Sequence, residues 1–275
     1  MKKTLSVLIA TILAAAFLTG CFGKKKDGHF TSQIKAKGKI VVYTNPEFPP
    51  YEYMGANGQI EGAEIEMVKK IAEKLGVKAE FVSAEFDSII GSVTTGKADL
   101  GASGFTINDE RKQVVSFSIP FVVSVQYLII PENSPIKTVE DLAGKKIGGQ
   151  NGTTGFMMVE DCINKGILKG TNTVAKSYNN APDAVVAMRA GQVDAVVIDD
   201  LVAKSLAKRN PGFKAIEMLT KEGKGLDLPE EFGLMVNKGN EDILVICNDV
   251  ISEMRANGSL EEIINKHQDI TTLAK

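Results

Sequence analysis

Strand and helix patterns alternate along this chain from about residue 36 onward, and this alternation limits the accessible folds more than any other feature. Ile40–Tyr43 is an apolar, β-branched strand pattern, and Glu64–Leu75 follows with apolar residues at helical spacing. Phe81-Val82 is the next strand pattern, and a short helix that begins at Asp87 as its cap ends at Gly96. Consecutive strand-helix-strand patterns predict an α/β fold with a largely parallel sheet.

A helix-to-strand pattern occurs once in each half of the chain. In both Gly96–Leu100 and Gly191–Ala195, a helix ends at glycine and an apolar strand opens after an aspartate. We therefore expect two lobes of similar build, with Ser124–Pro131 as the first crossing between them. The C-terminal helices should cover the first lobe, which places a second crossing near Glu231–Leu234. The apolar face of the first C-terminal helix comprises Ile243, Cys247, Val250 and Met254, and that of the second comprises Leu260, Ile263 and Ile264.

The first 20 residues have the layout of a secretory signal. Two lysines precede the apolar run Leu5–Leu18, which is shorter than the about 20 residues that span a membrane. The run ends in Leu18-Thr19-Gly20-Cys21, which resembles a bacterial lipobox. This resemblance implies a lipid on the Cys21 thiol, a mature chain that begins there, and attachment to the outer face of the cell membrane. Residues 21–35 would form a solvated tether. The alternative is an uncleaved anchor with an incidental cysteine.

Charge and composition argue against several classes of function. Without the two lysines of the signal, the chain has 30 basic and 34 acidic residues. This balance gives no support for nucleic-acid binding, which requires a basic surface. His29 and His267 are the two histidines, too few for a histidine-based metal site or a Ser-His-Asp triad. Cys162 and Cys247 lie in apolar helical patterns, which favours buried thiols over a disulfide. We expect no catalytic residues, no metal and no cofactor.

Four segments place polar or aromatic residues just after predicted strands, where ligands bind in open α/β sheets. Arg111 offers a guanidinium fork for a carboxylate, and Gly152–Gly155 offers backbone N–H groups at a helix start. Asp199 offers a partner for an ammonium group, and Phe48 and Phe86 offer apolar faces. The set is complementary to a zwitterion. Taken singly, each residue also fits an ordinary role as a surface arginine, a helix entry, an N-cap or a core phenylalanine.

The order of these motifs resembles the polar amino-acid-binding proteins of ABC importers, bacterial extracellular solute-binding protein family 3. The similarity runs from about Gly38 to the C-terminus and rests on Gly62–Met67, Ser103–Arg111, Gln150–Gly155 and Val193–Asp199. It implies a two-lobe Venus flytrap fold of type II joined by two hinge strands. Lobe 1 would span residues 36–122 and 231–275, and lobe 2 residues 123–230. The protein would be a monomer that delivers an amino acid to an ABC permease.

The resemblance also implies roles for matching residues. Arg111 would bind the ligand α-carboxylate with backbone N–H groups of Thr106 and Thr154, and Ser103 and Asp199 would bind the α-amino group. The implied ligand-binding set comprises Asn45, Phe48, Phe86, Ser103, Gly104, Phe105, Thr106, Arg111, Gln150, Thr153, Thr154 and Asp199.

Two positions near the ligand side chain depart from the family pattern. Asn45 stands where relatives that bind charged or amide ligands often carry an aspartate, and Ile198 where the glutamine binder has a polar residue. Gln150, at a position that contributes to selectivity, carries no charge. We therefore expect a neutral polar amino acid such as glutamine. The nearby acids Glu47, Glu52 and Asp87 leave a cationic amino acid such as arginine or lysine open, and cystine is a further alternative.

Two other classes of protein compete with a binding protein. A dehydratase-like enzyme on the same fold would need paired carboxylates, for which Glu64 and Glu66 are candidates. Two residues apart on a helix they face different directions, so a solvated helix start is the favoured interpretation and we predict no enzyme activity. A sensor module normally carries a membrane span and a signalling domain in the same chain, which this sequence does not suggest.

Overall fold

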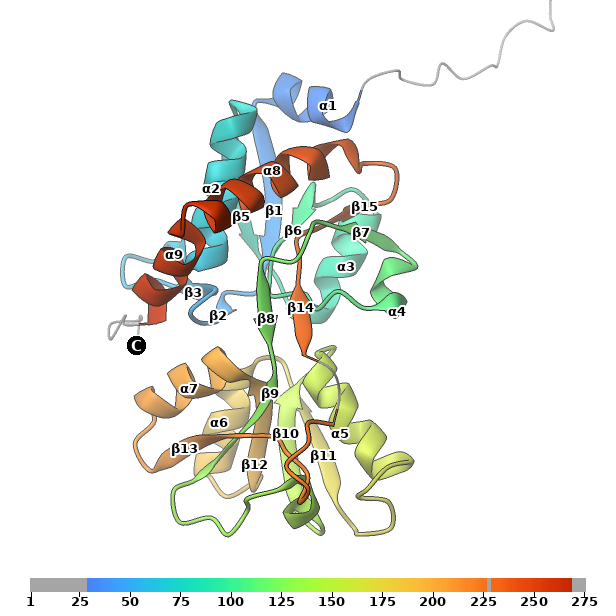
Figure 1. Ribbon diagram of the computed structural model, residues 1–275, viewed down its shortest axis with the longest axis vertical. Helices are drawn as coiled ribbons and strands as arrows, with labels where there is room; N and C mark the ends of the chain where they lie inside the picture. The colour runs from blue at the N-terminus through green and yellow to red at the C-terminus, as the bar shows by residue number, and fades with distance from the viewer. Residues whose placement is uncertain (1–28, 227–228, 269–275) are drawn as a thin grey trace, which may run out of the picture.

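The computed structural model describes residues 29–226 and 229–268, which form two lobes stacked along the long axis (Figure 1). The predicted signal, Cys21 and the tether up to residue 28 lie outside the described residues. Helix α1 (Phe30–Lys37) occupies the remainder of the predicted tether. Its Ile34 is buried and Gly38 ends the helix at φ 70°. The folded part therefore begins earlier than the tether prediction allowed.

Lobe 1 is built on a five-stranded sheet in the order β5-β1-β6-β15-β7. The first three strands are parallel, and β15 is antiparallel to its neighbours. The strands are β1 (Lys39–Thr44), β5 (Lys78–Ser83), β6 (Leu100–Gly101), β7 (Val115–Phe117) and β15 (Met235–Asn237). The lobe also contains α2 (Ala63–Leu75), α3 (Phe86–Thr94), α4 (Asp109–Lys112) and the small sheet β2 (Glu47–Phe48), β3 (Glu52–Met54) and β4 (Ile60–Glu61).

Lobe 2 repeats this plan with the order β11-β10-β12-β9-β13, again with three parallel strands followed by an antiparallel one. The prediction of two similarly built lobes is confirmed. The strands are β9 (Gln126–Pro131), β10 (Lys146–Gln150), β11 (Val174–Tyr178), β12 (Ala195–Asp199) and β13 (Phe213–Glu217). The helices are the 3-10 turn η1 (Val139–Leu142), α5 (Thr154–Asn164), α6 (Ala181–Arg189) and α7 (Asp200–Arg209).

The repeated aspartate has the same structural role in both lobes. Asp99 accepts the Val41 N–H through its carboxylate at 2.7 Å and donates its own N–H to the Val41 carbonyl at 2.9 Å. Asp194 makes the equivalent pair with Lys146, both at 2.7 Å. Each aspartate therefore joins the start of β6 or β12 to the parallel strand beside it, β1 or β10, which explains why the pattern recurs.

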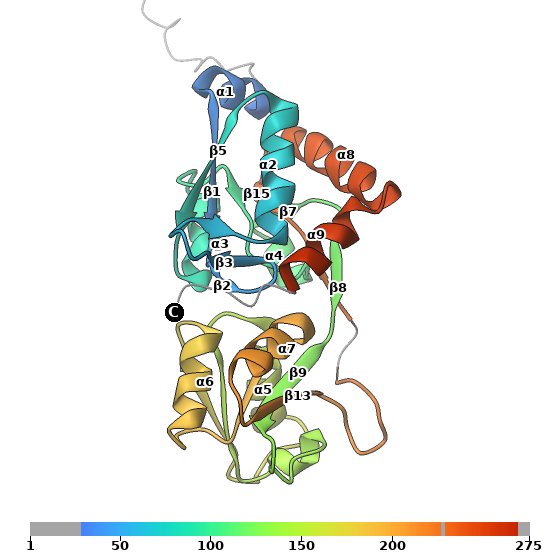
Figure 2. The same cartoon turned by 90° about the vertical axis from the view of Figure 1, so that its left-hand side faces the viewer.

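Two short antiparallel strands, β8 (Val122–Ser124) and β14 (Glu230–Phe232), join the lobes (Figure 1). The chain enters the lobe 2 sheet at Gln126, so the first crossing ends before the predicted segment does. After β14 the chain returns to lobe 1, where α8 (Asp242–Ala256) and α9 (Ser259–Gln268) lie beside α2 (Figure 2). Their predicted apolar faces are confirmed, because Ile243, Cys247, Val250, Met254, Leu260 and Ile263 are buried and Ile264 packs against the same core.

Several local predictions can be compared directly. Cys162 and Cys247 are buried free thiols, as favoured. Asp87 was wrong as a helix cap: Glu85 precedes the first residue of α3, and the Asp87 carboxylate instead accepts a hydrogen bond from Asn151 in the other lobe at 2.7 Å. Within the described ranges, no helix has the length and apolar character needed to cross a membrane.

Candidate functional site

A pocket between the lobes is lined by eleven of the twelve residues predicted to bind a ligand. Phe105 is the exception: it is fully buried and stacks on Phe86 with 4.4 Å between ring centroids. The structure thus brings the set together, while its role in binding stays a prediction. Lobe 1 contributes Asn45, Phe48, Phe86, Ser103, Gly104, Thr106 and Arg111, and lobe 2 contributes Gln150, Thr153, Thr154 and Asp199.

Arg111 is held rigidly at the lobe 1 side of the pocket. The Asn108 side chain caps α4 by accepting the Arg111 N–H at 2.8 Å. The guanidinium donates to the carbonyls of Thr106 at 2.9 Å and of Gly152, in lobe 2, at 3.1 Å. It also lies over the Phe105 ring, 5.2 Å from the centroid. These bonds use two of the five N–H donors of a guanidinium, which leaves donors for a carboxylate.

Asp199 ends β12 on the lobe 2 side and is buried. Its carboxylate accepts a hydrogen bond from Gln126 Nε2 at 3.2 Å. Burial, followed by the negative charge of Glu230, raises the pKa of Asp199 to about 8. Burial lowers the pKa of Arg111 to about 10, so the guanidinium stays charged at neutral pH. Arg111 and Asp199 are the residues with ionisable side chains among those that line the described pocket.

Both glycines at the start of α5 are needed by the surrounding structure. Gly152 has φ 77°, and a Cβ there would lie 3.1 Å from the Asp87 side chain of lobe 1. A Cβ on Gly155 would lie 2.1 Å from the side-chain oxygen of Gln126. Thr153 caps the helix by accepting the Phe156 N–H at 3.3 Å. The first N–H groups of α5 have no acceptor within the helix, which suits this end of the pocket to an anion.

Two neutral amides meet across the lobes at another part of the pocket. Gln150 donates to the Asn45 side-chain oxygen at 3.0 Å and to the Asn179 carbonyl at 3.1 Å. Asn45 donates its own amide to the Ala84 carbonyl at 2.9 Å. Glu47 and Asp87, which left a cationic ligand open, do not line the pocket. This part of the pocket therefore presents amides rather than charge.

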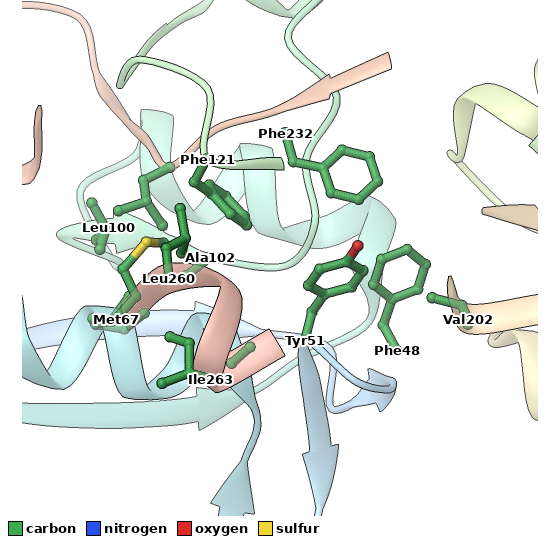
Figure 3. Close-up of a cluster of buried hydrophobic side chains, with 14 of the residues drawn as sticks. Phe48, Tyr51, Met67, Leu100, Ala102, Phe121, Val202, Phe232, Leu260 and Ile263 are labelled. Atoms are coloured by element: carbon green, nitrogen blue, oxygen red, sulfur yellow. The ribbon is translucent and has the colours of Figure 1, made fainter. Parts of the chain in front are cut away.

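The aromatic walls of the pocket belong to the lobe 1 core. Phe48 stacks on Tyr51 with centroids 5.6 Å apart and lies 6.1 Å from Phe232 of the hinge strand β14. Figure 3 shows these three rings in one cluster with Phe121. Phe48 can therefore be a core residue and also form the pocket wall, because its packing in the core fixes the position of the ring.

A buried pair of acids under the pocket was missed from the sequence. The Ser103 hydroxyl donates to Glu52 at 3.0 Å, and the Gly104 N–H donates to Glu64 at 2.8 Å. Burial, followed by the charge of Glu64, raises the pKa of Glu52 well above its usual value. Burial raises the pKa of Glu64 to about 7. Each acid has a second buried oxygen with no hydrogen-bond partner, and a proton shared between the two carboxyls satisfies both oxygens.

One earlier interpretation changes as a result, and the expected divergence of Glu64 and Glu66 is confirmed. Glu64 was expected at a solvated helix start, but it is 1% exposed because Gly104 and Glu52 supply its partners. Glu66 points elsewhere, to His267 at 2.9 Å, so the two glutamates do not form an acid-base pair. The Ser103 hydroxyl already accepts the Asn45 N–H at 3.0 Å and donates its proton to Glu52, which leaves one lone pair for a ligand.

The lobes are in close contact around the pocket. Besides the bonds of Arg111 and Gln150, the hydroxyls of Thr106 and Thr154 lie 3.2 Å apart across the lobes. The space open to the centre of a water-sized molecule is about 10 Å³, which is room for roughly one water. A ligand of amino-acid size therefore requires the lobes to move apart before it can enter.

Two similar α/β lobes on a two-strand hinge, with a polar pocket between them, define the class of two-lobed solute-binding proteins. Residues 40–269 match the model of the family described as bacterial extracellular solute-binding proteins, family 3. The chain belongs to this family, whose members include amino-acid-binding proteins of ABC transporters.

Individual relatives support this assignment. The chain is 31% identical to the L-cystine-binding protein TcyJ of Escherichia coli (strain K12), over 93% of this chain and 92% of the relative. Among solved structures, an amino acid ABC transporter substrate-binding protein from Streptococcus pneumoniae, bound to L-arginine, matches with TM-score 0.81 and 31% identity, covering 90% of this chain and 100% of that one. An ancestral arginine-binding protein bound to glutamine matches with TM-score 0.73 and 36% identity, covering 84% and 97%. These relatives are binding proteins rather than enzymes.

Proposed function

We propose that this protein captures a polar L-amino acid by closing its lobes and delivers it to an ABC permease. The observation that carries the proposal is the placement of Arg111 and Asp199 on opposite lobes of one pocket. The α-carboxylate would bind to the free guanidinium donors and to N–H groups at the start of α5, and the ammonium group to Asp199. Closure excludes water and strengthens each charged contact.

A neutral polar side chain, with glutamine as the first candidate, fits the amides of Asn45 and Gln150 best. Arginine and cystine are the second candidates, because relatives carry those names or ligands. A thermal-shift screen of the twenty amino acids with ornithine, citrulline and cystine tests the proposal, since ligand affinity adds directly to stability. Absence of any shift, with a folded protein, would refute amino-acid binding. A shift with arginine or cystine alone would refute the neutral substrate.

We further propose that the chain acts outside the cytoplasm as a lipoprotein held to the membrane through Cys21. The lipobox-like segment and the extracellular description of the family support this placement. Helix α1, near which the described part begins, lies at the end of lobe 1 away from lobe 2 (Figure 1), so the anchor would attach on that side. Such a link leaves both lobes free to move.

A further inference from the structure

Glu230 is a buried carboxylate at the junction of the two lobes and the hinge. It is the first residue of β14 and pairs with Ser124 of the other hinge strand. Its exposure is 9%, so the charge needs polar partners in place of water. The residue does not line the pocket, and it was not among the residues predicted from the sequence to contact a ligand.

The partners of Glu230 come from both lobes. Oε2 accepts hydrogen bonds from the hydroxyl of Thr106, in lobe 1, at 2.5 Å and from the hydroxyl of Thr154, in lobe 2, at 2.6 Å. Oε1 accepts from Gln126 Nε2 at 3.1 Å, and the same amide group donates to Asp199 at 3.2 Å. One side chain on the hinge thus contacts a residue from each wall of the pocket.

This arrangement depends on the angle between the lobes. A single oxygen can hold both threonine hydroxyls only while they lie close together, as their 3.2 Å separation shows. When the lobes separate, the carboxylate loses at least one charge-assisted bond. Water can replace the lost bond once the cleft opens, so the net gain from the bonds is modest, but it favours the closed arrangement.

The same bonds define how the threonines face a ligand. Each hydroxyl has one proton, and both protons are donated to Glu230. Towards the pocket the hydroxyls are therefore acceptors only. The backbone N–H groups remain the donors for a ligand carboxylate, and the carboxylate of Glu230 fixes the side chains beside them.

We propose that Glu230 is a positioning residue that holds the closed lobes together by accepting hydrogen bonds from Thr106 and Thr154 at once. This rests on the proposed function, in which the closed form retains the amino acid. Glu230 contributes to retention of the ligand rather than to its first encounter with an open lobe. Its loss should therefore accelerate ligand dissociation and leave association unchanged.

The test replaces Glu230 with its neutral isostere, Glu230→Gln. The matched control is Glu231→Gln, the next residue of the same strand, whose side chain is exposed. Rates are measured by rapid mixing and chase with radiolabelled L-glutamine, or with L-arginine where glutamine does not bind. We expect dissociation to accelerate about tenfold in Glu230→Gln, as for the loss of one hydrogen bond to a charge, with Glu231→Gln unchanged. Equal dissociation rates in the two variants overturn the proposal.

Small-angle X-ray scattering without ligand separates this proposal from the proposed function. If neither amino acid binds the wild-type protein, the proposed substrates fail, and scattering still tests Glu230. We expect a larger radius of gyration for Glu230→Gln than for the wild type and Glu231→Gln, and identical values refute the lobe-holding role. If Glu230→Gln does not fold, Thr154→Val removes the hydrogen bond from Thr154 and leaves the bonds from Thr106 and Gln126. We expect Thr154→Val to release the ligand faster or, without ligand, to have a larger radius of gyration. If neither change occurs, the proposal is refuted.

Discussion

Replacing the acid at the end of β12 by its amide, Asp199→Asn, tests how the pocket binds an ammonium group. Burial and the charge of Glu230 raise the pKa of Asp199 to about 8. In this closed arrangement without a ligand, the carboxyl therefore carries a proton at neutral pH. An ammonium group favours the ionised form, so ligand binding should expel that proton.

The size of the effect follows from the pKa. At pH 7, one unit below a pKa of about 8, about nine in ten Asp199 carboxyls are protonated. Binding should release about 0.9 proton per ligand at pH 7 and about 0.1 at pH 9. Because proton release sets the pH dependence of binding, affinity should rise roughly ninefold from pH 6 to pH 7 and level off above about pH 9.

Isothermal titration calorimetry in two buffers of different ionisation enthalpy measures this proton release. Asp199→Asn should abolish it and weaken binding. Asp200→Asn is the matched control, since Asp200 is the next residue and pairs with Lys204 at 3.2 Å, and it should retain most of the release. Tight binding by the wild type at pH 7 with the same enthalpy in both buffers would refute the reasoning.

Three further changes test other parts of the structure. Arg111→Ala should weaken amino-acid binding by more than about 2 kcal/mol, roughly 30-fold, because a buried ligand carboxylate loses its partner; near-normal affinity by calorimetry would contradict its role. Glu64→Gln should flatten the pH dependence of stability: burial raises the Glu64 pKa from 4.5 to about 7, so the wild type loses stability as pH rises across that window. Thermal melts between pH 4 and 8 measure this loss, and an unchanged slope would contradict the assignment. Cys21→Ser should move the protein from the membrane fraction to the soluble fraction, and continued membrane association would contradict lipid attachment.

The parts of the fold that sequence patterns predicted are those set by local periodicity. The strand at Ile40–Tyr43, the helix at Glu64–Leu75 and the faces of α8 follow from side-chain spacing alone, because burial repeats with the period of each element. Arg111, Gly152–Gly155 and Asp199 were predictable for a related reason, because each follows a predicted strand and ligands bind beyond the carboxyl ends of such strands. The lobes have separate sheets, so the complete set of pocket residues was predicted only through the resemblance to the family.

The residues that escaped prediction are defined by contacts between distant segments. Glu52 and Glu64 are twelve residues apart in sequence and share no helix face, yet both fold under the turn at Ser103-Gly104. Glu230 meets Thr106 and Thr154 only because the hinge brings three separate segments together. Acidic residues near helix starts or in short strands are ordinarily solvated, so no local pattern distinguishes these from surface residues.

Glu230 connects the two charged ends of the proposed mechanism. It supplies the second-largest contribution, after burial, to the raised pKa of Asp199, and it accepts bonds from both lobes. Removing its charge should therefore reduce proton release on binding and accelerate dissociation in the same variant, because one carboxylate has both effects. The dissociation rate and the proton release on binding can also change independently in this variant. Faster dissociation with unchanged proton release would mean that the bonds to the threonines, rather than the field at Asp199, determine ligand retention. Reduced proton release with unchanged dissociation would overturn the lobe-holding role and leave only the effect of the Glu230 charge on the pKa of Asp199.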